Sequence, residues 1–346
     1  MIDLYALNVD ELGALLKEWG HPRFRAAQIW GWMYDRGAAS FDEMSDLPKS
    51  LRGQLSEHTT LGTLRVATEQ RSSDGTIKRL YRLSDGQLIE SVLMCYRDGR
   101  RTACISSQAG CAMGCTFCAT GQMGLARQLS PTEIFQQAAI YSRELQARGE
   151  RLSNIVLMGM GEPLHNYDAV LQAVRRINQD LGIGARRITL STVGIVPGIE
   201  RLATEGLQLT LAISLHATQD DVRGRMMPVN RKWPIAELLR ACRAYQRATN
   251  RRITFEWALI AGKNDSVDEA ARLGRLLRGL NCHVNVIPLN PTSGYDGRPT
   301  SSDAVGHFVD ELQSHGVPTT VRMRRGIDID AGCGQLKSRV VRGGEE

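Results

Sequence analysis

The sequence predicts an α/β protein: a partial (β/α)6 barrel with a small N-terminal helical module and a β-hairpin extension. First, from about residue 100 onward, apolar runs of strand length alternate with amphipathic helical segments, as in parallel sheets. Second, residues 62–104 alternate in polarity around two Asp-Gly pairs, which is typical of hairpins. Third, the first 60 residues carry apolar side chains at helical spacing. We therefore divide the chain into a helical module at 1–60, a hairpin region at 61–100, the barrel at 101–337 and a tail at 338–346.

The N-terminal module is expected to contain three short helices. They are expected over residues 8–19, 25–36 and 49–57. Asn8 or Asp10 suits the first N-cap, because short polar side chains accept hydrogen bonds from the amides of the first turn. Trp30 and Trp32 either close a small core or join nearby arginines in an RNA-docking surface, and we favour the core.

The hairpin region is marked by its turns. Asp74-Gly75 and Asp85-Gly86 suit the backbone of tight hairpin loops. An acidic residue, Glu90, falls within the strand pattern that follows. On its local sequence alone, Glu90 is expected at a solvent-facing strand position.

The barrel elements then follow in regular order. Ser130, Pro131 and Glu133 mark the start of a helix, because serine and glutamate at this spacing form a capping box and proline suits the first turn. Strands are expected over residues 102–107, 155–158, 187–192, 207–215, 252–260, 283–289 and 317–323, and helices are expected between them. In parallel barrels the functional loops follow the C-terminal ends of the strands, and we expect the site there.

Three cysteines lie in the loop after the first barrel strand. Cys111, Cys115 and Cys118 have the spacing C-x3-C-x2-C, and Phe117 precedes the last of them. Thiolates are soft ligands that suit iron–sulfur clusters and zinc. Zinc sites usually supply four ligands, commonly as two pairs. Three thiolates fit a [4Fe–4S] cluster whose fourth iron binds a small molecule, and the spacing resembles that of the radical S-adenosylmethionine (SAM) superfamily.

The later post-strand loops carry polar groups suited to holding SAM. The loop Met158-Gly159-Met160-Gly161-Glu162-Pro163 resembles the motif that contacts the SAM amino group in that superfamily. A histidine at the end of a strand could instead be a core residue, but above a barrel mouth we favour ligand contact. The expected SAM-binding residues are Gly161, Glu162, Ser191, Ser214, Leu215, His216 and Asn290. Asp220, Asp221 and Arg223 follow one of these loops, where a role limited to helix capping remains open.

Composition narrows the classes of protein and partner. The net charge of +6 and pI near 9.0 favour a phosphate-rich partner such as RNA. No run of 18 apolar residues appears, and the N-terminus lacks the pattern of a secretory signal. Eight cysteines could form disulfides, but their clustering and the chain length favour a reduced, cytoplasmic protein. Cys242 and Cys282 lie in apolar segments and are expected in the core.

Two further cysteines extend the resemblance. Cys104 lies in Cys-Ile-Ser-Ser-Gln-Ala-Gly-Cys, and Cys333 in Ile-Asp-Ala-Gly-Cys-Gly-Gln-Leu. On its local sequence alone, Cys333 could be an ordinary loop cysteine. Together with the cysteine triad, the Gly-Met-Gly-Glu-Pro loop and Ser-Leu-His-Ala, these segments resemble the RlmN/Cfr family of radical SAM RNA methyltransferases. The resemblance runs from the N-terminus to about residue 337 and implies methylation of adenine C2 in 23S rRNA and in tRNA.

The resemblance also implies how this chemistry proceeds. Adenine C2 is not nucleophilic, so a polar transfer from SAM would fail and a radical is required. One SAM would methylate Cys333, and a second would be cleaved at the cluster, so that a radical on the methyl group of Cys333 adds to C2. Glu90 matches the base that removes the C2 proton. Cys104 would then form a transient disulfide with Cys333 and release the RNA, and reduction of that disulfide needs a reducing compartment. An electron donor such as flavodoxin or ferredoxin is implied.

Two alternatives remain open on sequence. A Cfr-type enzyme shares the cysteines and the mechanism but methylates C8 of the rRNA adenine. A protein of another class, a non-catalytic iron–sulfur RNA-binding protein, would need neither the SAM-binding loops nor Cys333. We favour the C2 methyltransferase.

Overall fold

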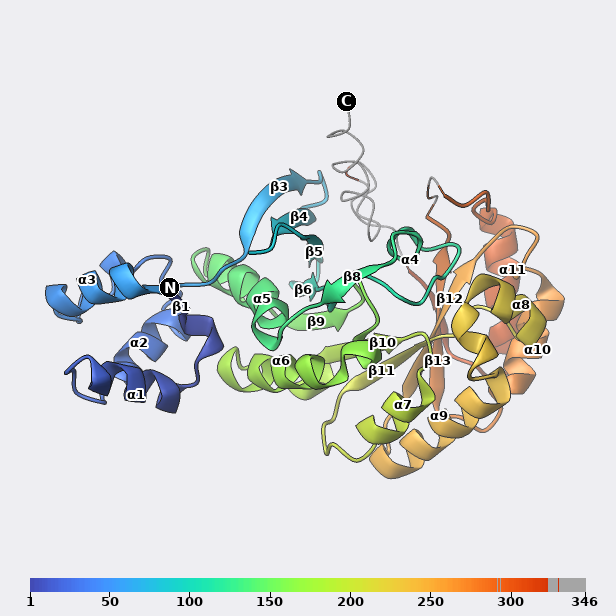
Figure 1. Ribbon diagram of the computed structural model, residues 1–346. Helices are drawn as coiled ribbons and strands as arrows, with labels where there is room; N and C mark the ends of the chain where they lie inside the picture. Colours follow the sequence, from blue (N-terminus) through green and yellow to red (C-terminus); the bar gives the residue numbers. More distant parts are fainter. Residues whose placement is uncertain (291, 293, 323–328, 330–346) are drawn as a thin grey trace.

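The computed structural model describes residues 1–290, 292, 294–322 and 329 (Figure 1). At the N-terminus, α1 (Val9–Glu18), α2 (Arg25–Tyr34) and α3 (Lys49–His58) form a helical group. Asn8 caps α1 as expected: its side chain accepts hydrogen bonds from the backbone amides of Asp10 and Glu11, and the Glu11 carboxylate accepts one from the Asn8 amide. This closed capping box explains why the helix begins where it does.

One open sheet runs through the rest of the described chain. Its strands, in spatial order, are β14 (Thr319–Val321), β13 (Cys282–Pro288), β12 (Ile253–Leu259), β11 (Thr210–Ser214), β10 (Ile188–Thr192), β9 (Asn154–Leu157), β6 (Arg101–Cys104), β5 (Leu88–Cys95), β4 (Ile77–Arg82) and β3 (Arg65–Arg71). All neighbours from β6 to β14 are parallel, whereas β3 to β6 are antiparallel. The hairpin region therefore extends the barrel sheet from its first strand, and the predicted partial barrel with a β-hairpin extension is confirmed.

Helices cover the outer side of the curved sheet (Figure 1). The six crossover helices are α5 (Pro131–Gln146), α6 (Tyr167–Asp180), α7 (Val196–Leu202), α9 (Ile235–Thr249), α10 (Val267–Leu276) and α11 (Ser302–Ser314). Shorter pieces are β1 (Ile2–Asp3), β2 (Thr59–Thr60), β7 (Gln108–Gly110), β8 (Leu125–Gln128), α4 (Ala119–Gln122), α8 (Asp220–Met226) and 3-10 turns at Leu4–Ala6, Phe41–Glu43, Pro163–Asn166, Ala185–Arg187 and Pro228–Arg231. The sequence did not predict β7, β8, α4 or α8, because such short elements complete too few periods to give a pattern.

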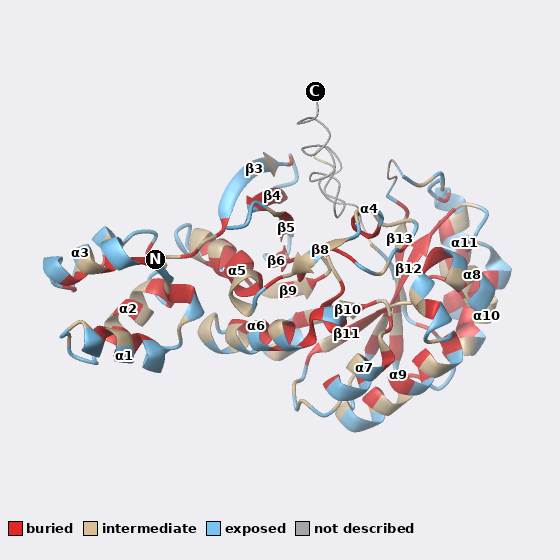
Figure 2. Ribbon diagram, viewed as in Figure 1, coloured by how far each residue is buried: buried red, intermediate tan, exposed pale blue. Residues whose placement is uncertain are grey.

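The N-terminal helices share one hydrophobic core with the barrel. Buried residues line both the strands and the helix faces that cover them (Figure 2). The rings of Tyr5 and Tyr34 pack 5.9 and 6.1 Å from that of Phe135 on α5, and Arg176 on α6 donates a hydrogen bond to the Tyr34 hydroxyl. Trp30 and Trp32 pack partly buried against this core, as expected.

Two other expectations concern buried cysteines and membranes. Cys242 and Cys282 are both buried in the core, as expected. Among the helices of the described residues, none combines the length and apolarity that crossing a bilayer requires.

Candidate active site

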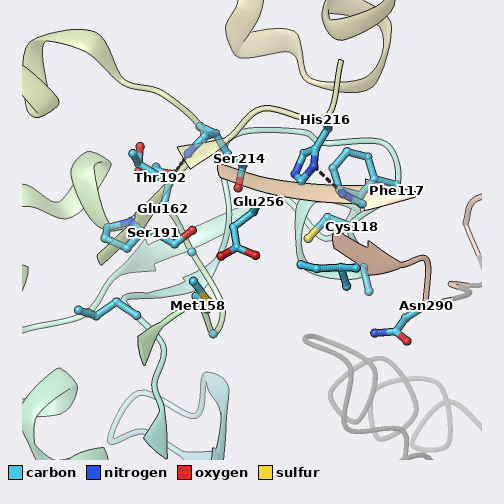
Figure 3. A pocket seen from close by; sticks show the side chains of 18 of the residues that line it. Phe117, Cys118, Met158, Glu162, Ser191, Thr192, Ser214, His216, Glu256 and Asn290 are labelled. Carbon is cyan, nitrogen blue, oxygen red and sulfur yellow. Dashed lines mark hydrogen bonds between the residues drawn. The ribbon is translucent and has the colours of Figure 1, made fainter. Parts of the chain in front are cut away.

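A cavity of about 290 Å³ opens at the C-terminal edge of the parallel strands. Its wall takes residues from the ends of β9 to β14 and from the loop after β7, so positions far apart in sequence face one space (Figure 3). Of the residues expected from sequence, those that line it are Cys118, Gly161, Glu162, Ser191, Ser214, His216 and Asn290. Leu215 does not line it, because its side chain is fully buried in the core.

The cluster loop, residues 111–118, crosses from β7 toward α4 beside this cavity. Cys111 and Cys115 are buried and Cys118 is half-buried. Burial raises the pKa of the Cys111 thiol to about 12. Within the described residues, no three or more His, Cys, Asp or Glu side chains converge to hold a single metal ion. An iron–sulfur cluster takes one thiolate per iron, so its thiolates stand apart. Three thiols on one short loop, with one facing the cavity, fit such a cluster.

The loop after β9 presents Glu162 under tight constraints. Gly161 has φ of +103°, and a Cβ there would lie 2.6 Å from the Gln108 Cβ, so only glycine fits. The Glu162 amide donates to the Gln108 side chain at 2.7 Å. Its carboxylate accepts hydrogen bonds from the amides of Leu164 at 3.0 Å and Val193 at 2.8 Å. Burial raises the pKa of Glu162 to about 7, so a cationic ligand would favour its charged form.

His216 follows β11 in the left-handed conformation, with φ of +59°. Its Nδ1 accepts a hydrogen bond from the Ala258 amide at 2.9 Å, so the neutral ring carries its proton on Nε2. The Phe117 ring packs edge-on, with centroids 5.0 Å apart. Burial, with a contribution from the Arg223 charge, lowers the pKa of His216 to about 3. His216 is therefore a neutral hydrogen-bonding group that joins the cluster loop to the cavity wall.

Glu90 and Cys104 lie outside the cavity lining but on one face of the sheet. Val92 pairs with Lys78 on one side and Cys104 on the other, and Glu90 is two residues from Val92, so all four side chains share that face. Glu90 is 2% exposed and its carboxylate lies 3.0 Å from the fully buried Lys78 ammonium. The expectation of a solvent-facing Glu90 is thus wrong, because its side chain is buried beside Lys78 in the folded chain.

Cys104 reaches toward the cavity wall. Burial raises the pKa of its thiol, opposed by the Arg322 charge and by a hydrogen bond with the Met158 backbone. Met158 and Arg322 both line the cavity, and the Arg322 Nη1 lies 3.8 Å from the Met158 sulfur. Cys104 therefore lies next to two residues of the cavity wall. A reacting group in the cavity would approach it from that side.

Four charged residues of this region were not predicted as part of the site. Lys78 pairs with Glu90, while Glu256 and Arg322 line the cavity, and Figure 3 shows the Glu256 carboxylate pointing into it. Arg223 is fully buried and donates hydrogen bonds to the carbonyls of Leu215, Val193 and Ser214, so it does more than cap its helix. Local sequence does not reveal that these side chains are buried or line a cavity, because isolated charged residues in amphipathic segments are usually solvated.

Cys333 lies outside the described residues. The predicted transient disulfide between Cys104 and Cys333 stays a prediction. Among the described residues, no two cysteines are joined by a disulfide.

Known proteins resemble the chain over almost its whole length. Residues 105–274 match the radical SAM superfamily, and residues 2–61 match the ribosomal RNA large subunit methyltransferase N-terminal domain. A dual-specificity RNA methyltransferase RlmN from Myxococcus xanthus is 55% identical over 343 residues, which cover 98% of this chain and 95% of that protein. A probable dual-specificity RNA methyltransferase RlmN from Moorella thermoacetica is 50% identical over 344 residues, covering 97% of each chain.

A solved structure agrees with these sequence matches. The crystal structure of a radical SAM methyltransferase from Sphaerobacter thermophilus superimposes with a TM-score of 0.92 at 49% identity, covering 97% of this chain and 99% of that one. The chain therefore belongs to the RlmN family of dual-specificity RNA methyltransferases, within the radical SAM superfamily.

Proposed function

We propose that this enzyme methylates adenine C2 in 23S rRNA and in tRNA, and that Cys333, Cys104 and Glu90 carry the transfer. Membership of the radical SAM superfamily implies a [4Fe–4S] cluster and SAM, and the methyltransferase family implies an RNA substrate. The observation that carries the proposal is the position of Cys104. Its side chain lies between Glu90 and the cavity wall and is close to both. Most residues of that wall are distant from Cys104 in sequence.

The candidate site residues in and beside the cavity divide by chemistry into two sets. Cys111, Cys115 and Cys118 would hold the cluster. Glu162 would bind the SAM ammonium, with Gly161 allowing close approach, while Ser191, Ser214, His216 and Asn290 offer hydroxyl, imidazole and amide groups to its polar parts. Leu215 would not contact SAM, and its contribution would be to set the spacing between Ser214 and His216. When bound, the cluster and SAM supply one-electron cleavage of SAM and hence a carbon radical.

The residues behind the wall would complete the reaction. Glu90, held beside the Lys78 ammonium at 3.0 Å, would accept the proton from adenine C2. Cys104 would close a disulfide with Cys333, which releases the methylated RNA. An external thiol and an electron donor such as flavodoxin or ferredoxin would restore the enzyme, as expected in a reducing cytoplasm. The helical module at residues 1–60 and the net positive charge would dock the RNA.

RNA mass spectrometry tests the proposed product. The chain is expressed in a host that lacks the modification, and rRNA and tRNA digests are searched for 2-methyladenosine and 8-methyladenosine. We expect 2-methyladenosine in both RNAs. If only 8-methyladenosine forms, the enzyme is of the Cfr type and the proposed regiochemistry is wrong.

Anaerobic turnover separates an enzyme from a non-catalytic iron–sulfur protein. Reconstituted protein is incubated with SAM and dithionite, and 5′-deoxyadenosine is measured by chromatography. We expect its formation, and its loss in Cys115→Ala, whereas Cys242→Ala serves as a control because that cysteine is buried in the core away from the cavity lining. A loaded cluster that yields no 5′-deoxyadenosine would rule out the catalytic function.

A further inference from the structure

Arg223 is a fully buried cation beside the cavity. It lies on α8, and its side chain is among the largest that are completely covered in the described residues. Burial lowers the pKa of Arg223 to about 10, so the guanidinium stays protonated near pH 7. A buried charge costs several kcal/mol unless other groups compensate for it. We therefore expect this buried cation to have a specific role.

The guanidinium joins the ends of two strands that carry cavity residues. It donates hydrogen bonds to the carbonyls of Leu215 and Ser214, both at 2.9 Å, and of Val193 at 2.7 Å. A fourth bond goes to the Asn230 side chain at 2.8 Å. Since Val193 follows β10 and Ser214 ends β11, Arg223 fixes the spacing of these two loops.

No carboxylate contacts the guanidinium within the part of the chain that the structure describes, and the Asp220 charge acts on it only from a distance. Arg223 makes no ion pair there, and Asp220, on the same helix, instead accepts hydrogen bonds from the Asn230 side chain and the Ile235 amide. The four acceptors of the guanidinium are neutral. The hydrogen bonds of the guanidinium are therefore satisfied by neutral groups, while its positive charge has no carboxylate in direct contact.

The cluster loop packs against the same short helix. The Thr116 amide donates to the Met226 carbonyl at 2.9 Å, and Cys115 packs with Met226 and Met227 in one buried group. Arg223 is close enough to Cys115 for the two to interact electrostatically. A dicationic [4Fe–4S] core with three thiolates carries one net negative charge, and one-electron reduction adds another.

We propose that Arg223 is a positioning residue whose fixed positive charge stabilises the reduced cluster while its hydrogen bonds align the loops after β10 and β11. The inference rests on the proposed function, because it requires a cluster at Cys111, Cys115 and Cys118. Nearby charge is one of the factors that set the reduction potential of such clusters. Loss of the cation should therefore make reduction harder, even where the loops keep their shape.

Potentiometric titration of the reconstituted full chain, followed by the electron paramagnetic resonance signal of the reduced cluster, tests this without measuring activity. Arg223→Gln keeps amide donors but removes the charge, and Arg223→Lys keeps the charge with fewer donor directions. We expect Arg223→Gln to shift the reduction equilibrium about tenfold toward the oxidised cluster, or about 59 mV for one electron. Arg223→Lys should shift it by less than half as much.

Arg225→Gln is the matched control, because Arg225 lies on the same helix but is exposed and pairs with Asp221 at the surface. Its potential should equal that of the unmodified chain. Equal potentials in Arg223→Gln and the unmodified chain would overturn the inference, as would a larger shift in Arg223→Lys than in Arg223→Gln. If Arg223→Gln does not fold, the Arg223→Lys titration still decides, since a shift of tenfold or more there contradicts a charge effect. An unmodified chain that assembles no cluster would instead refute the proposed function.

Discussion

The Lys78–Glu90 ion pair shows how one side chain depends on another at this site. Both groups are almost fully buried and their charged atoms lie 3.0 Å apart. Two charges removed from water are tolerable only together, because each loses its hydration and gains the other as partner. Lys78 thus stabilises the buried Glu90 carboxylate.

Lys78→Met should destabilise the fold strongly. It removes the ammonium that lies 3.0 Å from the buried Glu90 carboxylate, and loss of one partner of a buried ion pair typically costs about 3–5 kcal/mol. Urea unfolding of the apo-protein measures the loss. Arg225→Met, which breaks an exposed pair, should cost less than about 1 kcal/mol, and the double variant Lys78→Met/Glu90→Leu should recover most of the stability. Equal losses in Lys78→Met and Arg225→Met would show that the buried pair is unimportant.

His216 should make stability depend on pH. Its pKa is lowered to about 3 in the folded chain, whereas an unfolded histidine titrates near 6.5. The unfolded state therefore binds the extra proton first, and stability falls as the pH drops below about 6.5. Between pH 6.5 and 4, the wild type should lose about 3 kcal/mol more than His216→Asn. Asparagine tolerates the left-handed backbone at this position.

Unfolding of the two apo-proteins at pH 7, 5.5 and 4 provides the measurement. Parallel curves for the wild type and His216→Asn would contradict a buried, neutral imidazole.

The loop between β9 and α6 shows how a single turn places a functional group. The backbone of Gly161 lies so close to Gln108 that a side chain cannot enter, and this contact directs Glu162 inward. The carboxylate then bridges to Val193 after β10. The position of Glu162 is therefore a property of two loops, and either loop can disturb it.

Gly161→Ala should weaken SAM binding. The new Cβ would clash with Gln108 and add left-handed strain, together costing about 1–3 kcal/mol, and displacement of Glu162 should raise the SAM dissociation constant at least about tenfold. Gly206→Ala is the control: it has a φ of +67° but meets nothing within 4 Å, so it should cost about 1 kcal/mol and leave SAM affinity unchanged. Calorimetric titration of the cluster-loaded protein compares them. Unchanged SAM affinity in Gly161→Ala would contradict this account of the loop.

Some elements were readable from sequence because their signals are local. The capping box of Ser130 and Glu133 fixes the start of α5 as expected, and strand-length apolar runs located the parallel strands. By contrast, the burial of Glu90 beside Lys78 arises from tertiary packing. Arg223 likewise acquires its role only when the ends of β10 and β11 meet α8. Such roles depend on contacts between distant segments, which a single sequence does not display.

At the scale of the whole molecule, β6 joins two structures with different tasks. On one side it begins the parallel strands whose ends form the cavity, and on the other it pairs with the hairpin that carries Glu90 and Lys78. Cys104 is the last residue of this strand. The continuous sheet thus brings the thiol and the carboxylate beside the cavity without any long connecting loop.

The Cys104→Ala variant tests this arrangement most directly. It is incubated with RNA, SAM and a reductant. Cys95→Ala is the control, because Cys95 is a half-buried cysteine that does not line the cavity. Denaturing gels and mass spectrometry then measure covalent protein–RNA adduct and free methylated RNA. Without the resolving thiol, we expect Cys104→Ala to retain its cluster and accumulate the adduct, while Cys95→Ala releases product normally. Release of free methylated RNA by Cys104→Ala at the wild-type rate would contradict the central claim.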